Sequence, residues 1–429
     1  MAILSPLSKI LEKILYTQLY DYFTHNQILN SNLHGYRRNR STLTALLQMY
    51  DQWVRAASNG QVSGIIFLDL SAAFNLVDSE ILVKKLSIYG IENDMLNWIK
   101  SYMSERFQAV WIDNLFSDFI QHDIGVPQGS ILGPLLFLLY FNDLPHALKC
   151  DIQAYADDST LSASGSSSVE ISQSLADNCE TVVNWMSANR FKLNATKTHL
   201  LRVGTENKLR ACGSLNVVMD GVQLQEGEDR AEMLLGCQIQ SNLKWKLNID
   251  ELVKKLKVRI AGLSALKYVA PFPVRKTVTL AIFNSVLVYC LPLFGGADKA
   301  DIKRLQVMQN KAAQIVLRCP PRTSRRKMYE ELKWLTVNQL IVFHTLMLVF
   351  KIRKTKEPEF LANCLCLESR NQRIIVPNTR LSLASNSFLW RGARVWNMLP
   401  QALRKSLKVA EFKKEIFGWI TNNVKDFDD

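Results

Sequence analysis

The sequence predicts an α+β fold in its first half and a mainly helical fold in its second half. An apolar run from Ile65 to Leu68 leads into Asp69 and Leu70, which is typical of a strand buried on both faces. Two further short strands are indicated around Asp157-Asp158, because apolar residues flank the pair and Asp favours turns. From Asn248 onward apolar residues recur at helical spacing, as in Leu252, Leu256, Ile260 and Leu263.

Length and charge indicate a folded protein that binds a polyanion. At 429 residues and 48% hydrophobic composition, the chain can bury sizeable cores in two or three domains. Residues 1–250 carry 20 basic and 26 acidic side chains, whereas residues 251–429 carry 32 and 13. The basic second half favours nucleic acid binding by phosphate neutralisation. An acidic membrane is the competing partner, but no lipidation motif or signal peptide supports it.

The elements of the first half are expected in a fixed order. Amphipathic helices are predicted at 5–30 and 41–59, and Ser41 is a candidate cap for the second. After the strand that ends at Leu70 we expect a helix at 79–104, strands near 107–123, a loop and helix ending near 148, the Asp157-Asp158 hairpin, a helix at 169–190 and a pair of hairpins at 212–245.

Three carboxylates are candidates for a metal site. Asp157 and Asp158 are adjacent, and Asp69 stands at the end of the buried strand. Adjacent carboxylates repel unless a cation lies between them, and hard oxygen ligands favour Mg²⁺ or Mn²⁺ over zinc. An unpaired Asp69 would be costly to bury unless a metal neutralised it. Solvated turns are the competing interpretation for each of these residues.

A loop rich in glycine and proline lies between these sites. It runs from Gly125 to Pro134 and precedes the apolar residues 135–141. Glycines allow the backbone to approach a ligand closely, and the amide of Gln128 can hydrogen-bond polar groups. The loop therefore indicates a ligand contact at the start of a helix.

In this order, the motifs resemble the reverse transcriptases of non-LTR, LINE-type retrotransposons of the jockey and CR1 kind. The resemblance covers most of the chain. It is carried by Gly35 to Thr42, Phe67 to Phe74, Gly125 to Phe137, Tyr155 to Asp158, Lys192 to Thr198, Leu235-Gly236 and Arg391 to Asn397.

The resemblance implies a right-hand polymerase that uses two Mg²⁺ ions. Asp69, Asp157 and Asp158 match the catalytic metal ligands, and the carbonyl of Leu70 is a further ligand. Phe74 matches a steric gate that excludes a ribose 2′-hydroxyl and so favours deoxynucleotides. A core position is the competing interpretation of Phe74.

Other positions carry expected roles in substrate binding. Gln128 and Gly129 match the loop that packs under the templating base and incoming nucleotide, and Tyr155 lines the nucleotide site. Lys197 matches a residue that stabilises the leaving pyrophosphate, and Arg37 and Arg38 match residues that contact triphosphate oxygens. Leu235 and Gly236 match the primer grip. For Lys197 and the two arginines, solvated surface charge is the alternative.

The implied domains are partial fingers at 1–60, a palm with the primer grip at 61–245, a basic helical thumb at 246–350 and a helical extension at 351–429. The implied partners are an RNA template, a DNA primer and a deoxynucleoside triphosphate, and nuclear localisation is expected from the family.

Departures from the family pattern leave two other functions open. Asn75, Leu234 and Gln240 replace the usual Asp, Tyr and Asp, and the match begins partway through the fingers. A truncated nucleic-acid-binding relic with little or no polymerase activity is therefore an alternative. A metal-dependent nucleotidyl transferase without a template is a weaker one.

The second half contains three further features with competing interpretations. The apolar stretch Thr277 to Ala297 predicts a buried helix rather than a membrane span. Arg318 to Lys327 is expected to be an exposed basic loop that contacts phosphates. Late aromatic residues are expected in a helical core, although they could stack on bases; they are Trp390, Trp396, Phe412 and Trp419. The scattered cysteines and histidines show no zinc spacing.

Overall fold

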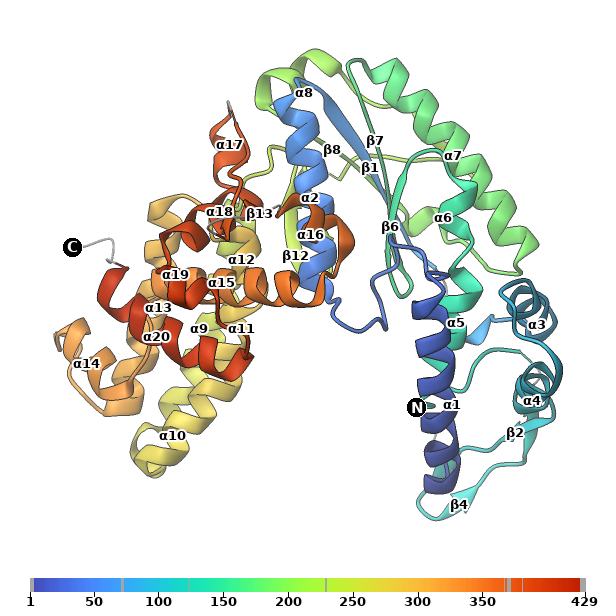
Figure 1. Ribbon diagram of the computed structural model, residues 1–429, viewed down its shortest axis with the longest axis horizontal. Coiled ribbons are helices and arrows are strands. Elements are labelled where there is room, and N and C mark those ends of the chain that lie inside the picture. The colour runs from blue at the N-terminus through green and yellow to red at the C-terminus, as the bar shows by residue number, and fades with distance from the viewer. Residues whose placement is uncertain are drawn as a thin grey trace. The chain divides into compact units, whose positions relative to one another are not determined.

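A computed structural model describes residues 4–70, 73–122, 124–227, 230–365, 367–368, 372–379 and 381–424. The chain divides into two units (Figure 1). The first comprises Met1–Ala45, Val62–Arg202 and Leu209–Gly227, and the second comprises Leu46–Gln61, Val203–Lys208 and Glu228–Asp429. Residues 46–61 and 228–245 thus belong to the second unit, although the expected boundaries group them with the fingers and the palm.

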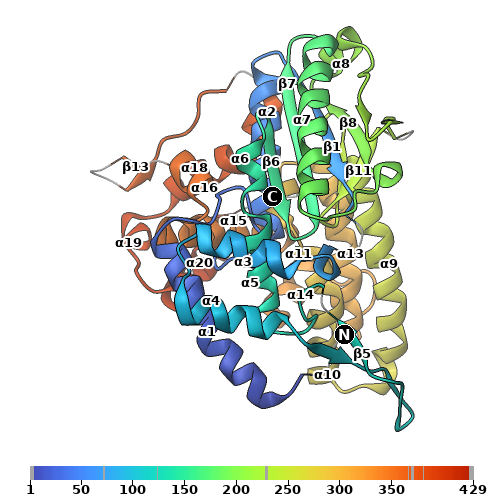
Figure 2. The same cartoon turned by 90° about the vertical axis from the view of Figure 1, so that its right-hand side faces the viewer.

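The first unit is built on a four-stranded sheet in the order β6-β7-β1-β8. The strands are β1 (Val62–Leu68), β6 (Asp151–Tyr155), β7 (Asp158–Gly165) and β8 (His199–Val203). Both β1 and β6 pair with β7 in antiparallel fashion. Helix α7 (Ser168–Ala188) runs along this sheet (Figure 2). A Cβ on Gly64 of β1 would lie 2.7 Å from Ile171 and 2.8 Å from Leu175 of α7, so glycine permits this close packing.

Helix α5 (Gly133–Phe141) forms the centre of the hydrophobic core. Eight of its nine residues are buried and it carries no charge, as expected for a helix that is apolar on all sides. Helix α1 (Pro6–His25) contributes the buried Glu12, whose carboxylate accepts hydrogen bonds from the backbone N–H groups of Ile131 (2.6 Å) and Leu132 (3.2 Å). The start of α5 is therefore capped by a side chain more than 100 residues away.

The helix expected at 79–104 is two helices, so this prediction is wrong in its middle. They are α3 (Ser79–Ile88) and α4 (Asn93–Met103). Gly90 has φ +88°, and the N–H groups of Gly90 and Ile91 donate to the carbonyls of Ser87 and Leu86. This is the Schellman arrangement that ends a helix at a left-handed glycine.

The strands predicted near 107–123 are confirmed as a hairpin at one end of the first unit (Figure 2). They are β2 (Arg106–Gln108), β3 (Trp111–Ile112), β4 (Leu115–Phe116) and β5 (Ile120–His122). Its apolar side chains are largely exposed, with Trp111 at 55% and Phe116 at 68%. The smaller elements of this unit are η1 (Ala73–Asn75), α6 (Leu144–Ala147), η2 (Ala195–Lys197), β9 (Val218–Met219) and β10 (Val222–Gln223); α8 (Glu206–Cys212) spans the division between the units.

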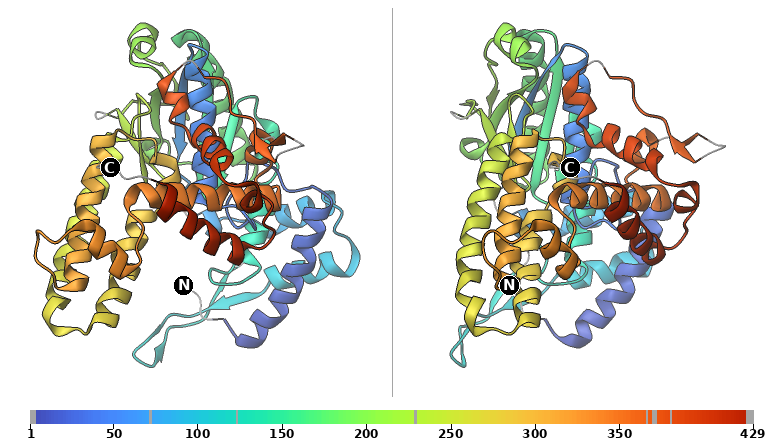
Figure 3. Two further views of the ribbon diagram at one scale, coloured as in Figure 1. Left: turned by 60° about the vertical axis from the view of Figure 1, so that its left-hand side comes forward. Right: turned by 90° about the vertical axis from the view of Figure 1, so that its left-hand side faces the viewer.

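The second unit is mainly helical, as predicted. Helices α9 (Lys246–Val269) and α13 (Lys299–Leu317) lie side by side (Figure 3). Leu252, Leu256 and Leu263 of α9 are buried, which confirms its apolar face. Four basic side chains on its other surface are exposed; they are Lys254, Lys255, Lys257 and Arg259.

The second unit also contains other helices and strands. The longer ones are α2 (Thr42–Ser58), which belongs to this unit from Leu46 onward, α15 (Val337–Thr355), α18 (Phe388–Met398) and α20 (Val409–Asn423). The shorter ones are β11 (Ala231–Leu234), β12 (Cys237–Gln240), α10 (Phe272–Thr279), α14 (Arg325–Leu332), α16 (Glu359–Cys364), β13 (Leu367–Glu368), β14 (Arg373–Ile374), α17 (Ser382–Ser385) and α19 (Gln401–Arg404). The predicted cap of α2 is confirmed, because Ser41 Oγ accepts from Thr44 N–H at 3.3 Å.

The single helix expected within 277–297 is broken, so this prediction is also wrong in part. After α10 the chain forms a π-helical turn η3 (Leu280–Asn284), then α11 (Ser285–Val288) and α12 (Leu291–Phe294). Cys290 has φ +52°, and Pro292 lacks the N–H that a continuous helix needs. Among the described residues no single helix could cross a membrane; only α14 and α15 together, bent by 40°, have the length and composition for it.

Two predictions for the late basic and aromatic residues have different outcomes. Trp396 and Phe412 are fully buried and pack on each other with ring centroids 5.8 Å apart, which confirms the core interpretation for these two. The expected basic loop is largely exposed from Arg318 to Ser324, but Arg325 to Lys327 lie in α14, so this prediction is wrong at its end; the contact with phosphates stays a prediction. Arg318 donates hydrogen bonds to the carbonyls of Lys267, Tyr268 and Ala270. Its guanidinium therefore ties α13 to the end of α9.

Candidate functional site

The turn between β6 and β7 presents the carboxylate pair. Tyr155 pairs with Asp158, which leaves Ala156 and Asp157 as a two-residue turn. Ala156 has φ +59°, a left-handed conformation that costs an alanine roughly 1–2 kcal/mol. Asp157 and Asp158 both keep a substantial part of their surface exposed. A strained turn thus carries Asp157 at its tip and Asp158 at the start of the next strand.

The register of the central strands brings the third carboxylate to the same edge. Leu68 is the Cα partner of Ser159, so the next residue of the chain, Asp69, stands beside Asp158. Partial burial, together with the negative charges of Asp157 and Asp69, raises the pKa of Asp158. Asp158 therefore lies within electrostatic reach of the other two carboxylates, and their shared role at a metal site stays a prediction.

The donor set at this edge fits a hard divalent cation. It consists of carboxylate oxygens, which Mg²⁺ and Mn²⁺ prefer, and their mutual repulsion would be relieved by positive charge. No group of three or more such side chains among the described residues is close enough to enclose a metal ion. The carboxylates are thus gathered on one edge without forming a closed cage.

The neighbouring backbone supports Asp69 and Leu70. The carbonyl of Asp69 accepts a hydrogen bond from Asn194 N–H at 3.1 Å, and Leu70 forms an antiparallel bridge with Leu193. Lys197 follows in the short helix η2 and is exposed. Residues 193–197 therefore lie on the Asp69 side of the sheet, although the role of Lys197 stays a prediction.

Phe74 lies in η1 between two other aromatic rings. Its ring is stacked on that of Phe137, with centroids 4.4 Å apart and planes at 16°, and meets the ring of Tyr36 edge-on at 5.7 Å and 84°. Phe74 is half-buried, so it is packed against the core while part of the ring stays open to solvent. Both interpretations from the sequence, gate and core filler, are compatible with this position.

The loop at 125–133 is paired with the segment that follows Asp69. Gly125 N–H donates to Val77 O (2.8 Å) and Val126 N–H to Phe74 O (2.9 Å). The amide of Gln128 donates to Asn75 Oδ1 at 2.9 Å, so Asn75 positions this side chain. Gly129 has φ +100°, a conformation that favours glycine. Gln128 thus lies beside the Phe74 segment, and its role in nucleotide binding stays a prediction.

The fingers motif extends the sheet at β6. His34 N–H donates to Ala154 O (2.7 Å) and Ala154 N–H to Asn32 O (3.0 Å). A Cβ on Gly35 would lie 2.4 Å from the backbone nitrogen of Ala156, so only glycine permits this approach. The segment 32–35 is therefore locked against the strand that carries the turn.

The two predicted triphosphate arginines both have partners within the protein. Arg37 donates to the carbonyls of Asn30 (2.5 Å) and Leu33 (3.4 Å). Arg38 forms an ion pair with Asp21 at 2.8 Å and covers the ring of Tyr20. Both side chains thus contribute to local structure, and their contact with a triphosphate stays a prediction.

The predicted primer grip is a hairpin of the second unit. Its strands β11 and β12 are joined by Leu235 and Gly236, with φ +45° and +79°. Tyr289 donates its hydroxyl to Leu235 O at 2.7 Å. Gln240 Oε1 accepts from Leu247 N–H in the first turn of α9. The hairpin is therefore tied to the helices of its own unit.

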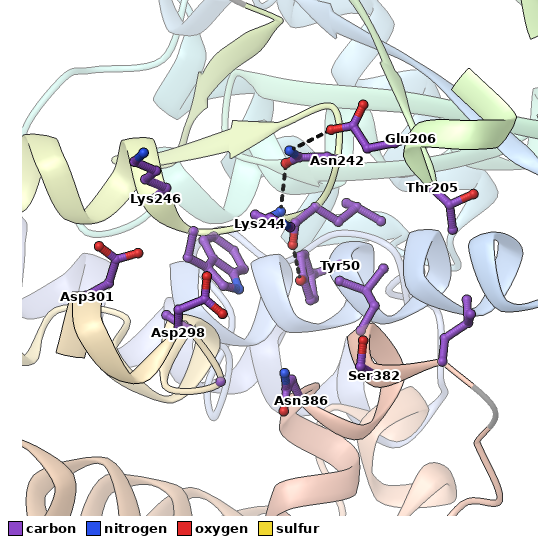
Figure 4. A pocket seen from close by; sticks show the side chains of 16 residues that line it. Tyr50, Thr205, Glu206, Asn242, Lys244, Lys246, Asp298, Asp301, Ser382 and Asn386 are labelled. Carbon is purple, nitrogen blue, oxygen red and sulfur yellow. Dashed lines mark hydrogen bonds between the residues drawn. The ribbon is translucent and has the colours of Figure 1, made fainter. Parts of the chain in front are cut away.

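A cavity of about 340 Å³ is also confined to the second unit. Figure 4 shows Asn242 joined to Glu206 on one side and Tyr50 bonded to the backbone of Leu243. Its wall carries both signs of charge, from Lys244, Lys246, Asp298 and Asp301. None of the predicted site residues lines it.

Sequence reasoning missed three residues that organise these sites: Tyr36, Glu12 and Tyr289. Tyr36 lies in the motif Gly35 to Thr42, but its contact with Phe74 depends on tertiary structure. No local signal marks Glu12 or Tyr289, because both act on segments distant in sequence.

Comparison with known proteins gives consistent matches. A family model described as reverse transcriptase (RNA-dependent DNA polymerase) matches residues 1–256. The chain is 25% identical over 374 residues to the probable RNA-directed DNA polymerase from transposon BS of Drosophila melanogaster, covering 80% of this chain and 39% of that protein. It is 23% identical over 349 residues to the RNA-directed DNA polymerase from mobile element jockey of the same species, covering 77% and 37%.

The chain spans about two-fifths of the length of these curated relatives. Among solved structures, apo telomerase from Candida tropicalis matches with a TM-score of 0.45 and 10% identity, covering 96% of this chain and 61% of that chain.

Proposed function

The chain belongs to the reverse transcriptase family, and we propose that it is an RNA-directed DNA polymerase from a LINE-type mobile element. The matches to the transposon BS and jockey polymerases confirm the resemblance that the motifs predicted. The observation that carries the proposal is the strand register, which sets Asp69 beside Asp158 at the turn that presents Asp157.

In this proposal Asp69, Asp157 and Asp158 would hold two Mg²⁺ ions, with the carbonyl of Leu70 as a further ligand and Mn²⁺ as a substitute. Bound Mg²⁺ would supply positive charge for activating the primer hydroxyl and for stabilising the leaving group. In the proposed reaction the 3′-hydroxyl oxygen gives up its proton and attacks the α-phosphorus of the nucleotide; the new phosphodiester bond replaces the bond from that phosphorus to the leaving pyrophosphate. The carboxylates orient the two reactants for this displacement.

Other residues of the first unit select and place the nucleotide. Phe74 occupies the space of a ribose 2′-hydroxyl, which distinguishes RNA from DNA precursors. Gln128 and Gly129 pack beneath the base pair, and Tyr155 lines the site. The proposed role of Lys197 is to stabilise the departing pyrophosphate by its charge.

The second unit is proposed to hold the primer and template. Its exposed lysines on α9 suit a phosphate backbone, because cationic side chains that displace counterions bind without sequence preference. Leu235 and Gly236 present a backbone tip of the kind that can support a primer end. We propose an RNA template and a DNA primer as the partners.

Primer extension tests the proposal. The purified chain is given poly(rA)/oligo(dT), Mg²⁺ and dTTP and compared with the double variant Asp157→Ala, Asp158→Ala. We expect extension by the wild-type chain and none by the variant. A matched control is Asp118→Ala, Glu180→Ala, which removes two exposed carboxylates of the same unit and should retain extension.

The result that contradicts the proposal is equally definite. If neither protein extends the primer while both bind the duplex, the polymerase assignment fails and a nucleic-acid-binding relic is left. Retained extension in the double variant would remove the metal role of these carboxylates.

A further inference from the structure

The ring of Phe74 lies between a buried aromatic residue, Phe137, and an exposed one, Tyr36. Phe137, whose ring stacks on Phe74, is 2% exposed and belongs to the packed helix α5. Tyr36, whose ring meets Phe74 edge-on, is 44% exposed. Edge-to-face and stacked aromatic pairs are each favourable geometries. The orientation of the Phe74 ring therefore depends on a core residue on one side and on Tyr36 on the other.

The backbone of Tyr36 adopts a costly conformation to reach this place. Its φ is +58°, in the left-handed region that is unfavourable for a bulky residue. The flanking bonds enforce it: His34 N–H donates to Ala154 O, and Arg38 N–H donates to the hydroxyl of Tyr20 at 2.8 Å. Strained residues of this kind cluster at functional sites, so the strain directs attention to what the ring contacts.

The ring of Tyr36 also lies near the carboxylate turn. Partial burial, followed by the negative charge of Asp157 and the neighbouring hydroxyl of Tyr155, raises the pKa of the Tyr36 hydroxyl. Gly35 brings the preceding backbone against Ala156. Tyr36 thus stands between the turn that carries Asp157 and the ring of Phe74.

We propose that Tyr36 is a positioning residue that sets sugar selectivity, by holding the Phe74 ring where it excludes a 2′-hydroxyl. This inference rests on the proposed polymerase function and assigns part of the discrimination to a residue of the fingers motif. The ring is the essential part, because the contact with Phe74 is between rings. The hydroxyl is dispensable for it.

The size of the effect follows from the contact. Without Tyr36 the exposed side of Phe74 has no support, so the ring can turn away and admit a ribonucleotide. An aromatic pair contributes about 0.5–1.5 kcal/mol, which corresponds to roughly a 2- to 10-fold loss of preference for the deoxynucleotide.

The test compares kcat/KM for dUTP and UTP on poly(rA)/oligo(dT), since these nucleotides differ only at the sugar. We expect Tyr36→Phe to keep the wild-type ratio within about two-fold. Both Tyr36→Ala and Tyr36→Leu should lower the ratio by the stated factor; the leucine variant keeps the bulk of the side chain should alanine impair folding. Trp111→Ala, which removes an exposed ring of the distal hairpin, is the matched control and should leave the ratio unchanged.

A double-mutant cycle separates positioning from a direct contact. If Tyr36 acts through Phe74, the variant Tyr36→Ala, Phe74→Ala should have the same ratio as Phe74→Ala alone. Independent, multiplied effects would overturn the inference. So would a Tyr36→Ala variant that loses rate equally with both nucleotides, because this is the mark of a purely structural residue.

Nucleotide binding keeps this inference separate from the polymerase assignment. With a dideoxy-terminated primer, the dissociation constants for dUTP and UTP are measured in the ternary complex by quenching of a fluorophore on the template. A chain that binds nucleotides without extending a primer would contradict the polymerase proposal, and the binding ratio would still decide the role of Tyr36. Absence of sugar preference in the wild-type complex would overturn the inference.

Discussion

The two units each present a hairpin with a two-residue turn, but the turns expose different chemistry. The turn of β6 and β7 has one residue at positive φ, Ala156, and presents the carboxylate of Asp157. The turn of β11 and β12 has two residues at positive φ, Leu235 and Gly236, and presents backbone and apolar groups. The same kind of turn, with residues at positive φ, thus presents a carboxylate in the first unit and main-chain groups in the second.

The two turns are also supported differently. The first is locked by backbone hydrogen bonds between Ala154 and the segment 32–34, and by the close approach of Gly35. The second is held by side chains, because Tyr289 donates to Leu235 O and Asn248 Oδ1 accepts from Gln238 N–H. Backbone support resists most substitutions, whereas support by side chains can be removed by one.

The largest expected effect comes from removing the charge at the first turn. Asp157→Asn should lower kcat for primer extension by roughly 10³-fold, because a metal ligand contributes several kcal/mol to the reaction. The exposed position predicts a change in unfolding free energy within about 0.5 kcal/mol. Steady-state kinetics and chemical denaturation check the two values.

The matched change at the second turn is Leu235→Ala, which removes no charge. Its Mg²⁺ dependence should equal that of the wild-type chain. An altered Mg²⁺ dependence in Leu235→Ala, or full activity of Asp157→Asn, would contradict the division of roles between the turns.

Crowding the backbone lock should cost the most stability. A Cβ at Gly35 would meet the backbone of Ala156 at 2.4 Å, so Gly35→Ala should destabilise the first unit by about 2–3 kcal/mol. Gly262→Ala is the control, since nothing lies within 4 Å of a Cβ there and alanine favours a helix by about 0.5–1 kcal/mol. Urea denaturation measures the change in unfolding free energy of each variant, which should be opposite in sign. Equal changes in both variants would show that the close approach of Gly35 to Ala156 does not stabilise the first unit.

Removing the side-chain support of the second turn should have a smaller effect. Tyr289→Phe deletes the hydrogen bond to Leu235 O, which contributes about 1 kcal/mol. We expect faster amide hydrogen exchange in residues 231–240 and unchanged exchange in β6 and β7. Equal protection of the hairpin in both proteins would show that Tyr289 does not support it.

The smallest effect concerns the pH dependence of stability. Because the folded-state pKa of Asp158 is raised, its protonated form stabilises the fold below the unfolded pKa, and this contribution is lost as pH rises through the folded pKa. Without metal, Asp158→Asn should therefore have a slightly higher Tm than wild type at pH 7, and the difference should shrink towards pH 4. Addition of Mg²⁺ should raise the Tm of wild type more than that of the variant; an unchanged difference across pH would contradict the electrostatic coupling.

Many local features were predictable from the sequence. The apolar run before Asp69, the turn at Asp157-Asp158 and the apolar face of α9 were all recognised, because each depends on residues within a few positions of one another. The break at Gly90 was missed although glycine within a helical pattern is a signal for one. There the periodicity continues on both sides, and only the left-handed φ of Gly90 ends the helix.

The sequence by itself determined the α+β order, the carboxylate pair and the basic helical second half, since periodicity and turn preferences act locally. Tertiary structure alone decided that Asp69 stands beside Asp158, that Asn75 holds Gln128 and that Tyr36 supports Phe74. It also engaged Arg37 and Arg38 with partners of their own. Except for the bonds of Arg37, these contacts join residues from 17 to about 90 positions apart in the sequence. Which of these residues meet depends on how the core packs, and no local sequence pattern encodes that packing.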